Sequence, residues 1–331
     1  MEALLAAELP EGEGWQFEPK WDGFRCLARR DGDDVTLTSK SGKPLARYFP
    51  EVVEMLSRVK ARQFLLDGEL IIPVGDALSF DALQLRLHPA ESRVRKLSAQ
   101  TPAELMAFDL LELDGKLLAG EPLRARRDKL DQFFRKNVTP GLQLSPMTRE
   151  RKVALGWLKR SGGALDGVIA KRADLEYRPG ERAMIKVKQQ RTADCVVGGF
   201  RYAEGKKVVG SLLLGLYDDA GLLDHVGFTS AIPSAERPKL TKELEKLISP
   251  PGFTGKAPGG PSRWSSERTT QWQPLKPVLV VEVRYDQVTS RRFRHGTGFL
   301  RWRPDKDPRQ CTLDQLAPEL RPSELKQLFA A

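Results

Sequence analysis

Residues 18–25 read Glu18-Pro19-Lys20-Trp21-Asp22-Gly23-Phe24-Arg25. Pro19 restricts the preceding glutamate to an extended conformation, and Gly23 permits a tight turn into a strand that starts at Phe24. A lysine held just before a strand, with a carboxylate two residues later and an arginine five residues later, is well placed to act as a nucleophile. On its own, however, the motif is more typical of a surface lysine beside an ordinary turn.

Strands and helices are predicted on both sides of this segment from hydrophobic periodicity and turn signals. The predicted strands are Phe24–Arg30, Val35–Ser39, Phe64–Ile72, 104–113, 167–174 and 183–190. The predicted helices are 50–60, 80–88, 122–136 and 149–161. The strand over 64–72 is apolar on both sides of Asp67-Gly68-Glu69, which suits a buried strand interrupted where the backbone faces a ligand.

The chain changes character after about residue 190. Short predicted strands with glycine-containing turns cover 196–201, 207–217, 222–229 and 278–289, with a helical piece at 234–248. A Pro/Gly/Ser-rich stretch over 249–277 is predicted to be a mobile loop. Five or so short strands with one helix predict a small barrel of the oligonucleotide/oligosaccharide-binding (OB) kind.

Composition sets the class of protein. The chain has 331 residues, of which 40% are hydrophobic and 30% charged, and this favours a soluble two-domain protein. No stretch approaches the roughly 18 consecutive apolar residues of a membrane-spanning helix, and the N-terminus shows no export signal. The cysteines are three and far apart, which fits a reducing cytoplasm. The net charge of +10 is expected for a protein that contacts a polyanion, although many basic proteins bind no nucleic acid.

Further motifs follow the lysine motif in a fixed order. They are Asp67-Gly68-Glu69, Phe108, Asp166-Gly167-Val168-Ile169-Ala170-Lys171 and Lys186-Val187-Lys188. This order and spacing resemble the covalent nucleotidyltransferases, which comprise polynucleotide ligases and mRNA capping enzymes. The resemblance spans about residues 15–190, with a further match near 291–308, and it implies that Lys20 is the catalytic residue that becomes covalently adenylated.

The chemistry of such a lysine explains why other cations accompany it. A free lysine is protonated at neutral pH and is not nucleophilic, whereas nearby cations and burial favour the neutral amine. Lys186 and Lys188 alternate on one predicted strand, so they are expected to point the same way and to neutralise the α-phosphate. The alternative for this pair is a solvated strand face.

The remaining nucleotide and metal contacts are assigned partly by resemblance. The carboxylates expected to hold a divalent cation, Mg²⁺ or alternatively Mn²⁺, are Asp22, Glu69 and Asp166. Glu69 resembles, as an alternative, a residue that contacts the ribose. The resemblance implies that Phe108 stacks on adenine, Glu18 helps to select adenine, and Arg25 contacts phosphate or ribose. Trp21 is counted among the expected nucleotide-binding residues, and an ordinary core position is the alternative for Phe108.

Two positions depart from the family pattern. Family members mostly carry Glu where this chain has Asp166, and the shorter side chain reaches about one methylene less far. Ligases usually show Ser/Thr-Arg-x-Gly where this chain has Ser39-Lys40-Ser41-Gly42. Lys40 keeps the positive charge expected at a phosphate but loses the planar fork of arginine.

A basic segment near the C-terminus extends the resemblance. Its cations are Arg291, Arg292, Arg294, Arg301, Arg303, Lys306 and Arg309, interleaved with Phe293, Phe299 and Trp302. Arg303 and Lys306 fall in a run that resembles the last ligase motif, R-x-D-K, which in the family orients the pyrophosphate of ATP. A solvated charged terminus is the alternative. Asp194 and Gly198-Gly199 lie where a hinge between domains is expected.

The sequence therefore predicts an α+β protein. A nucleotidyltransferase (adenylation) domain of antiparallel sheets flanked by helices is expected over 1–190, and an OB-fold β-barrel domain over 191–331. The chain resembles bacterial ATP-dependent DNA ligases of the stand-alone LigC kind, and also the ligase domain of LigD. It is expected to be a monomeric repair enzyme that uses ATP and seals nicked duplex DNA, with a repair polymerase as the candidate protein partner. The alternatives are an RNA or mixed RNA/DNA end ligase and a non-catalytic OB-fold nucleic-acid-binding protein.

Overall fold

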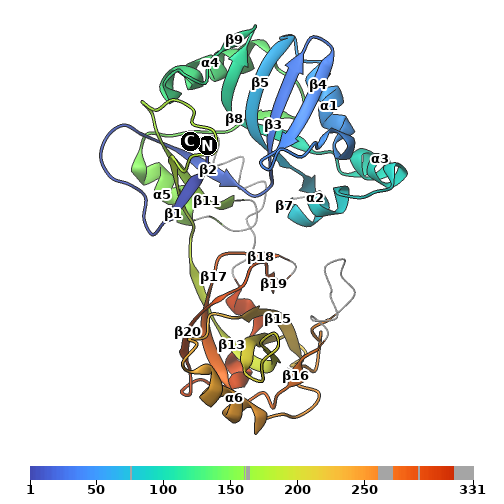
Figure 1. Ribbon diagram of the computed structural model, residues 1–331, viewed down its shortest axis with the longest axis vertical. Coiled ribbons are helices and arrows are strands. Elements are labelled where there is room, and N and C mark those ends of the chain that lie inside the picture. Colours follow the sequence, from blue (N-terminus) through green and yellow to red (C-terminus); the bar gives the residue numbers. More distant parts are fainter. Residues whose placement is uncertain (75–76, 160, 162–164, 260–270, 290, 317–331) are drawn as a thin grey trace. The chain divides into compact units, whose positions relative to one another are not determined.

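The computed structural model describes residues 1–331 except 75–76, 160, 162–164, 260–270, 290 and 317–331. The chain divides into two compact units, one formed by Met1–Gln189 and the other beginning at Gln190 (Figure 1). Each unit has a hydrophobic core of its own. Within the described part of the chain, no helix is long and apolar enough to cross a membrane.

A four-stranded sheet in the first unit carries the lysine motif. Its order is β1 (Ala3–Ala6), β12 (Met184–Val187), β11 (Leu165–Arg172) and β2 (Trp15–Trp21). β1 and β12 are parallel, and the other pairs are antiparallel. Alternate residues of β2 point to opposite faces, so Phe17 and Trp21 enter a core that also includes residues of α5 (Arg151–Lys159).

β3 begins at Phe24 as predicted, so Lys20 does come just before a strand, but Lys20 itself lies inside β2, which was not predicted. β2 contains Pro19 and is an edge strand, where a proline is tolerated. On the outer edge of β2, Phe17 exchanges two backbone hydrogen bonds with Thr148, of 2.8 and 2.9 Å. Pro19, two residues further on, faces the same edge and has no N–H to donate.

A six-stranded sheet forms the other layer of the first unit, and Figure 1 shows its main strands side by side. The path runs β10 (Leu142–Leu144), β8 (Glu104–Leu113), β5 (Gln63–Ile71), β3 (Phe24–Asp31) and β4 (Asp34–Ser39), with β9 (Lys116–Leu117) paired to β8. The helices of this unit, besides α5, are α1 (Pro50–Ser57), α2 (Phe80–Arg86), α3 (Glu91–Gln100) and α4 (Leu123–Lys136). Smaller elements are the turn η1 (Ala46–Tyr48) and the hairpin of β6 (Pro73–Val74) and β7 (Ala77–Leu78). The predicted strands of this layer are confirmed, whereas α3 and β10 were not predicted.

The second unit is built on one antiparallel sheet. The path runs β15 (Leu223–Thr229), β14 (Val209–Tyr217), β13 (Arg191–Tyr202), β17 (Val280–Tyr285) and β20 (Gly298–Trp302), with β16 (Gln273–Pro274) paired to β13. Smaller elements are α6 (Arg237–Glu245), the hairpin of β18 (Val288–Thr289) and β19 (Arg292–Phe293), and the turns η2 (Pro308–Gln310) and η3 (Leu313–Gln315). An isolated bridge joins Thr229, at the end of β15, to Thr297, just before β20. This arrangement is consistent with an OB fold, although the described strands do not pair into a closed barrel.

The residues expected at a hinge lie inside β13 instead. A Cβ atom on Gly198 would come within 2.6 Å of the Phe253 ring, and one on Gly199 within 2.6 Å of the Trp272 ring. Both glycines therefore make room for aromatic side chains of the second unit. The predicted mobile loop over 249–277 overlaps 260–270, which lies outside the described residues, while its described part includes β16.

Candidate active site

The candidate site follows one face of β2. Gln16, Glu18 and Lys20 are alternate residues and share that face, opposite the buried Phe17 and Trp21. Glu18 and Lys20 line a pocket of about 540 Å³, within the range of small-molecule sites. Successive members of the row stand about 7 Å apart along the strand. The carboxylate of Glu18 and the ammonium of Lys20 therefore reach the same pocket at two points along β2.

At the Lys20 end, the lysine forms part of a charged triad. Its Nζ lies 2.6 Å from Oδ2 of Asp166, and the Nζ of Lys188 lies 3.0 Å from the other oxygen of the same carboxylate. Asp166 is buried on β11, and Lys188 directly follows β12. Both of these positions were predicted, and the structure brings them together with Lys20.

Lys186 supplies a further cation to the same pocket. Burial, followed by the charges of Lys20 and Lys188, holds the pKa of Lys186 below its usual range. A pKa lowered by neighbouring ammonium groups means that these charges lie close to one another. The first unit therefore gathers three lysines around one carboxylate, an arrangement suited to binding an anion.

In the middle of the pocket, aromatic and ionic groups meet. The Nζ of Lys171 lies 2.6 Å from Oε2 of Glu18 and 4.6 Å from the centre of the Phe108 ring. The Nε2 of Gln16 donates to Oε1 of Glu18 over 2.7 Å. Phe108, on β8, is half-buried and lines the pocket. Its exposed ring area offers a surface on which a flat base can stack.

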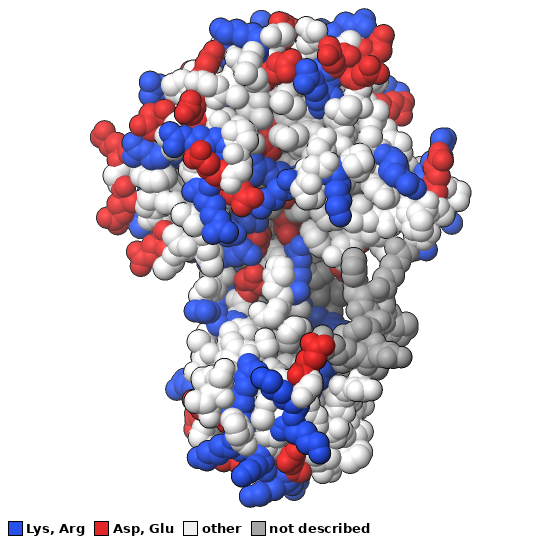
Figure 2. Space-filling model, in the orientation of Figure 1, with Lys and Arg blue, Asp and Glu red and all other residues white. Residues whose placement is uncertain are grey.

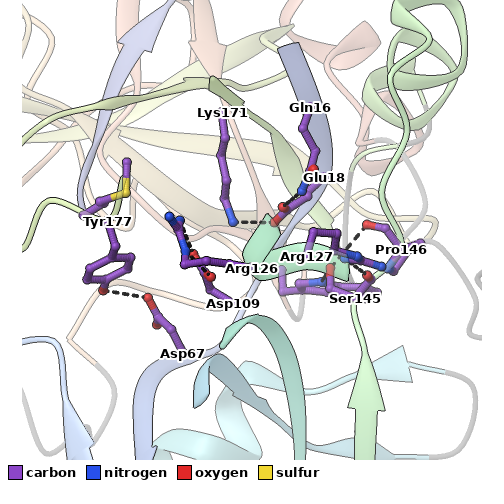
Figure 3. A network of polar contacts seen from close by, with 12 residues as sticks. Gln16, Glu18, Asp67, Asp109, Arg126, Arg127, Ser145, Pro146, Lys171 and Tyr177 are labelled. Carbon is purple, nitrogen blue, oxygen red and sulfur yellow. Dashed lines mark hydrogen bonds and ion pairs between the residues drawn. The ribbon is translucent and has the colours of Figure 1, made fainter. Parts of the chain in front are cut away.

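Arg25 is held in place by the buried carboxylate of Asp67. Its guanidinium donates to both oxygens of Asp67, from Nε over 3.0 Å and from Nη2 over 2.6 Å. The hydroxyl of Tyr177 also donates to Asp67, over 2.8 Å, as Figure 3 shows. The same view includes a second fork, between Arg126 and the buried Asp109. The paired arginine on β3 therefore enters the pocket in a fixed orientation.

Glu69 is the most perturbed carboxylate of the site. Burial raises its pKa to about 8, although Lys20 and Arg25 act in the opposite direction. A Cβ atom on Gly23 would lie 2.8 Å from Cγ of Glu69 and 2.1 Å from the carbonyl oxygen of Leu70. Glycine at this position therefore lets the turn of the lysine motif close over β5.

The three predicted metal ligands do not form one cluster. Among the described residues there is no group of three or more Asp, Glu, His or Cys side chains that could hold a metal ion. The oxygens of Asp166 face Lys20 and Lys188, and Glu69 and Asp22 are half-buried. Mg²⁺ is commonly held by one or two carboxylates together with substrate phosphates and water. The residues present fit such a shared site and not an all-protein cage.

Trp21 and Lys40 occupy the boundary of the pocket. The indole of Trp21 is buried and donates to Oγ of Ser145 over 3.0 Å, so it forms a wall of the pocket from the core side. Lys40, after β4, is exposed, and its Nζ lies 3.1 Å from Oε1 of Glu2. The first residue is positioned by packing, and the second by a surface ion pair.

Arg303 and Lys306 belong to the second unit, where Asp194 organises them. The Nη1 of Arg303 donates to both oxygens of Asp194, over 2.9 and 3.0 Å, and its Nη2 donates to Asp305 over 2.9 Å. Lys306 lies 4.0 Å from Asp194. The backbone of Asp194 is in turn bonded to the amide of Gln315 in both directions. These cations are therefore held in place by a buried strand, β13.

Several pocket residues were missed by sequence reasoning. Lys171, Arg182 and the residues of β1 line the pocket, and Asp67 and Tyr177 orient Arg25. Lys171 ends a motif that was noticed, and it is buried, which a lysine rarely is without a partner. Its position directly opposite Gln16 across β2 and β11 depends on strand register, which the sequence does not reveal.

Comparisons with known proteins identify the family of the chain. Residues 5–188 match the family described as ATP dependent DNA ligase domain, and residues 205–306 match ATP dependent DNA ligase C terminal region. The chain is 46% identical over 319 residues to DNA ligase C2 of Mycolicibacterium smegmatis, covering 92% of this chain and 90% of that protein. It is 30% identical to the multifunctional non-homologous end joining DNA repair protein LigD of Mycobacterium tuberculosis, covering 89% of this chain but 37% of that protein.

A solved structure supports the fold. The structure described as "DNA binding with a minimal scaffold: Structure-function analysis of Lig E DNA ligases" aligns with a TM-score of 0.54 and 18% identity. The alignment covers 92% of this chain and the whole of that one. The similarity therefore extends over both units.

Proposed function

Because the chain belongs to the ATP-dependent DNA ligase family, we propose that Lys20 attacks ATP and becomes covalently adenylated during nick sealing. The observation that carries this proposal is the row on β2. It sets Lys20 among cations at one end of a pocket and Glu18 beside an aromatic ring further along. A nucleotide in this pocket would place its base near Phe108 and its α-phosphate near Lys20.

The proposed reaction consists of three displacements at phosphorus. The Nζ of Lys20 forms a bond to the α-phosphorus of ATP, and pyrophosphate leaves. The 5′-phosphate at the nick then attacks the lysyl-AMP and takes the AMP. Finally, the adjacent 3′-hydroxyl attacks the 5′-phosphorus, which seals the strand and releases AMP. Lys186 and Lys188 would stabilise the charge that develops in the first step, and Asp166 offers a proton acceptor 2.6 Å from the nucleophile.

The family implies a divalent metal, for which we propose Mg²⁺, with Mn²⁺ as the alternative. Glu69 and Asp166 would hold the ion together with phosphate oxygens, and Asp22 is placed close enough to Glu69 to affect its pKa. The ion would neutralise phosphate charge during transfer. Alternatively, Glu69 would accept a hydrogen bond from the ribose of the nucleotide. Arg25 would contact the phosphate or ribose.

We propose that Lys40 contacts the phosphate of the nicked strand and that Arg303 and Lys306 bind the pyrophosphate group of ATP. Trp21 would support the nucleotide from the pocket wall. The net charge of +10 supports a polyanionic substrate, and Figure 2 shows lysines and arginines on the visible face of both units. The division of the chain near residue 190 would separate the adenylation domain from the OB-fold domain.

Repair is the proposed biological role, supported by the similarity to LigD. A repair polymerase is the proposed protein partner, and the enzyme is proposed to act as a monomer. The three cysteines are free and buried, which supports a reducing, cytoplasmic environment. An RNA or mixed RNA/DNA end ligase is the alternative, and sealing rates on matched DNA and RNA nicks would separate the two activities.

Labelling tests the covalent step directly. Wild-type protein and the Lys20→Ala variant are incubated with Mg²⁺ and ATP labelled at the α-phosphate, and the label that survives denaturation is counted. We expect acid-labile label on the wild type and none on the variant, because the variant lacks the nucleophile. A parallel reaction with α-labelled GTP distinguishes adenylation from the guanylation of capping enzymes. Absent label on the wild type, or undiminished label on Lys20→Ala, would contradict the proposal.

A further inference from the structure

Lys171 is a buried cation that the proposed chemistry does not use. Its side chain is only 5% exposed, yet it lines the nucleotide pocket. Its ammonium is bound between Oε2 of Glu18, at 2.6 Å, and the face of the Phe108 ring, at 4.6 Å. A buried lysine costs free energy unless it is paired. Its location between the carboxylate and the aromatic ring indicates a role at the base end of the pocket.

The carboxylate of Glu18 is held at both oxygens, as Figure 3 shows. Lys171 binds one oxygen from β11, and the amide of Gln16 donates to the other from two residues earlier on β2. Each carboxylate oxygen has two lone pairs, so each keeps capacity to accept one more hydrogen bond. Glu18 can therefore accept a further hydrogen bond, and the direction of that bond is fixed by the two existing contacts.

The orientation of Gln16 shows how closely Glu18 is constrained. Gln16 is fully buried, and within the described part of the chain its Oε1 has no hydrogen-bond partner. Reversing the amide would turn this oxygen toward the Glu18 carboxylate, where two acceptors would face each other. The amide is therefore oriented by Glu18 even though one buried oxygen stays unpaired.

We propose that Lys171 is a positioning residue that makes the pocket prefer a 6-aminopurine nucleotide over a 6-oxopurine nucleotide. This inference rests on the proposed function. An ionised Glu18 accepts a hydrogen bond from a 6-amino group but repels a 6-oxo group, because both are acceptors. Lys171 makes ionised Glu18 tolerable in a buried place. Without it, Glu18 loses the ion pair that fixes one of its oxygens, and the preference for a 6-amino donor weakens.

Nucleotide discrimination tests the inference. The ratio of kcat/KM for ATP to that for GTP is measured for label transfer to Lys20 in the wild type and in Lys171→Met, which removes the charge but keeps the length. We expect this ratio to fall about tenfold or more, mainly through a higher KM for ATP. A role confined to folding would lower labelling with both nucleotides alike and leave their ratio unchanged.

A double-mutant cycle shows whether Lys171 acts through Glu18. In a Glu18→Gln background, Lys171→Met should change the ratio no further, because the group that it orients is already neutral. Lys129→Met is the matched control, since Lys129 pairs with both oxygens of Glu121 outside the pocket, at 2.7 and 2.6 Å. This control should keep the wild-type ratio.

The possible failures can be told apart. An unchanged ratio in folded Lys171→Met, or effects that add in the double variant, would overturn the inference while leaving the proposed function intact. Absence of label on the wild type would instead contradict the proposed function. If Lys171→Met does not fold, Gln16→Met decides the question. It removes the other bond to Glu18 and should lower the ratio in the same direction, and an unchanged ratio there overturns the inference.

Discussion

The folded protein disfavours the charged form of Glu69. Its pKa is raised from 4.5 to about 8, with burial as the main cause, so the folded state keeps a proton at neutral pH that the unfolded chain releases. The unfolded state then binds fewer protons between pH 4.5 and 8, and the free energy of unfolding falls as pH rises through this window. A binding residue is thus maintained at the expense of stability.

Glu69→Gln should separate these two effects. We expect the free energy of unfolding of the variant, relative to wild type, to rise between pH 5 and pH 8 by on the order of 2 to 4 kcal/mol, as measured by urea denaturation. The same variant should lose lysyl-nucleotide formation, because an amide, unlike a carboxyl group, cannot lose a proton to hold the metal ion as a carboxylate. Glu91→Gln, at an exposed carboxylate on α3, is the control and should show little change with pH. Parallel pH profiles for Glu69→Gln and wild type would show that Glu69 ionises normally.

The approach of β11 to β12 depends on one glycine. Gly167 has φ of +133°, and a Cβ atom there would lie 2.1 Å from the carbonyl oxygen of Val187. Gly167→Ala should push the strands apart and separate Asp166 from Lys188. We expect at least a tenfold loss of adenylation and a destabilisation of about 2 to 4 kcal/mol, measured by labelling and by thermal unfolding.

A second glycine provides the matched control for this element. Gly156, in α5, has open space where a Cβ would lie. Gly156→Ala should be neutral or stabilising by about 0.5 to 1 kcal/mol, and adenylation should be unchanged. If Gly167→Ala behaves like Gly156→Ala, the strand contact does not position Asp166.

Elements with a clear apolar pattern could be predicted from the sequence. The strand over 104–113 is confirmed as β8 with the same bounds, because it is a mostly apolar run that Asp114-Gly115 ends. α3 could not be predicted, because Val94 is its one fully buried residue and the helix shows no apolar stripe. The strand that carries Lys20 was not predicted, because the sequence does not show that β2 lies at a sheet edge, where Pro19 is tolerated.

Site residues could be predicted where they belong to a sequence motif. They could not be predicted where two side chains are brought together only by the register of neighbouring strands. Lys20, Asp166 and Lys188 were expected near one another from motif order, and their ion pairs agree with this. The pairing of Lys171 with Glu18 requires the register of β2 against β11, between segments far apart in the sequence. Long-range register depends on packing that a local pattern does not contain.

At the scale of the whole molecule, the positive charge should make substrate binding depend strongly on salt. Each phosphate that a cation neutralises releases condensed counterions from DNA, and four such contacts would weaken binding about a hundredfold between 50 and 200 mM salt. We expect this loss in equilibrium titrations of nicked duplex DNA. Label transfer from ATP should change far less over the same range, because it involves no extended polyanion. Equal salt dependence of the two reactions would contradict a distributed electrostatic interface.

Pro19 has a further consequence, one for the solubility of the protein. An edge strand with free N–H groups is a template on which another chain can add a strand and start aggregation. On β2, Thr148 covers the outer edge at Phe17, and Pro19 leaves that edge without a donor two residues later. The strand that carries the nucleophile can therefore stay accessible without recruiting other chains. Proteins in which Pro19 is replaced should show their defect first as precipitation during expression, before any change in rate can be measured.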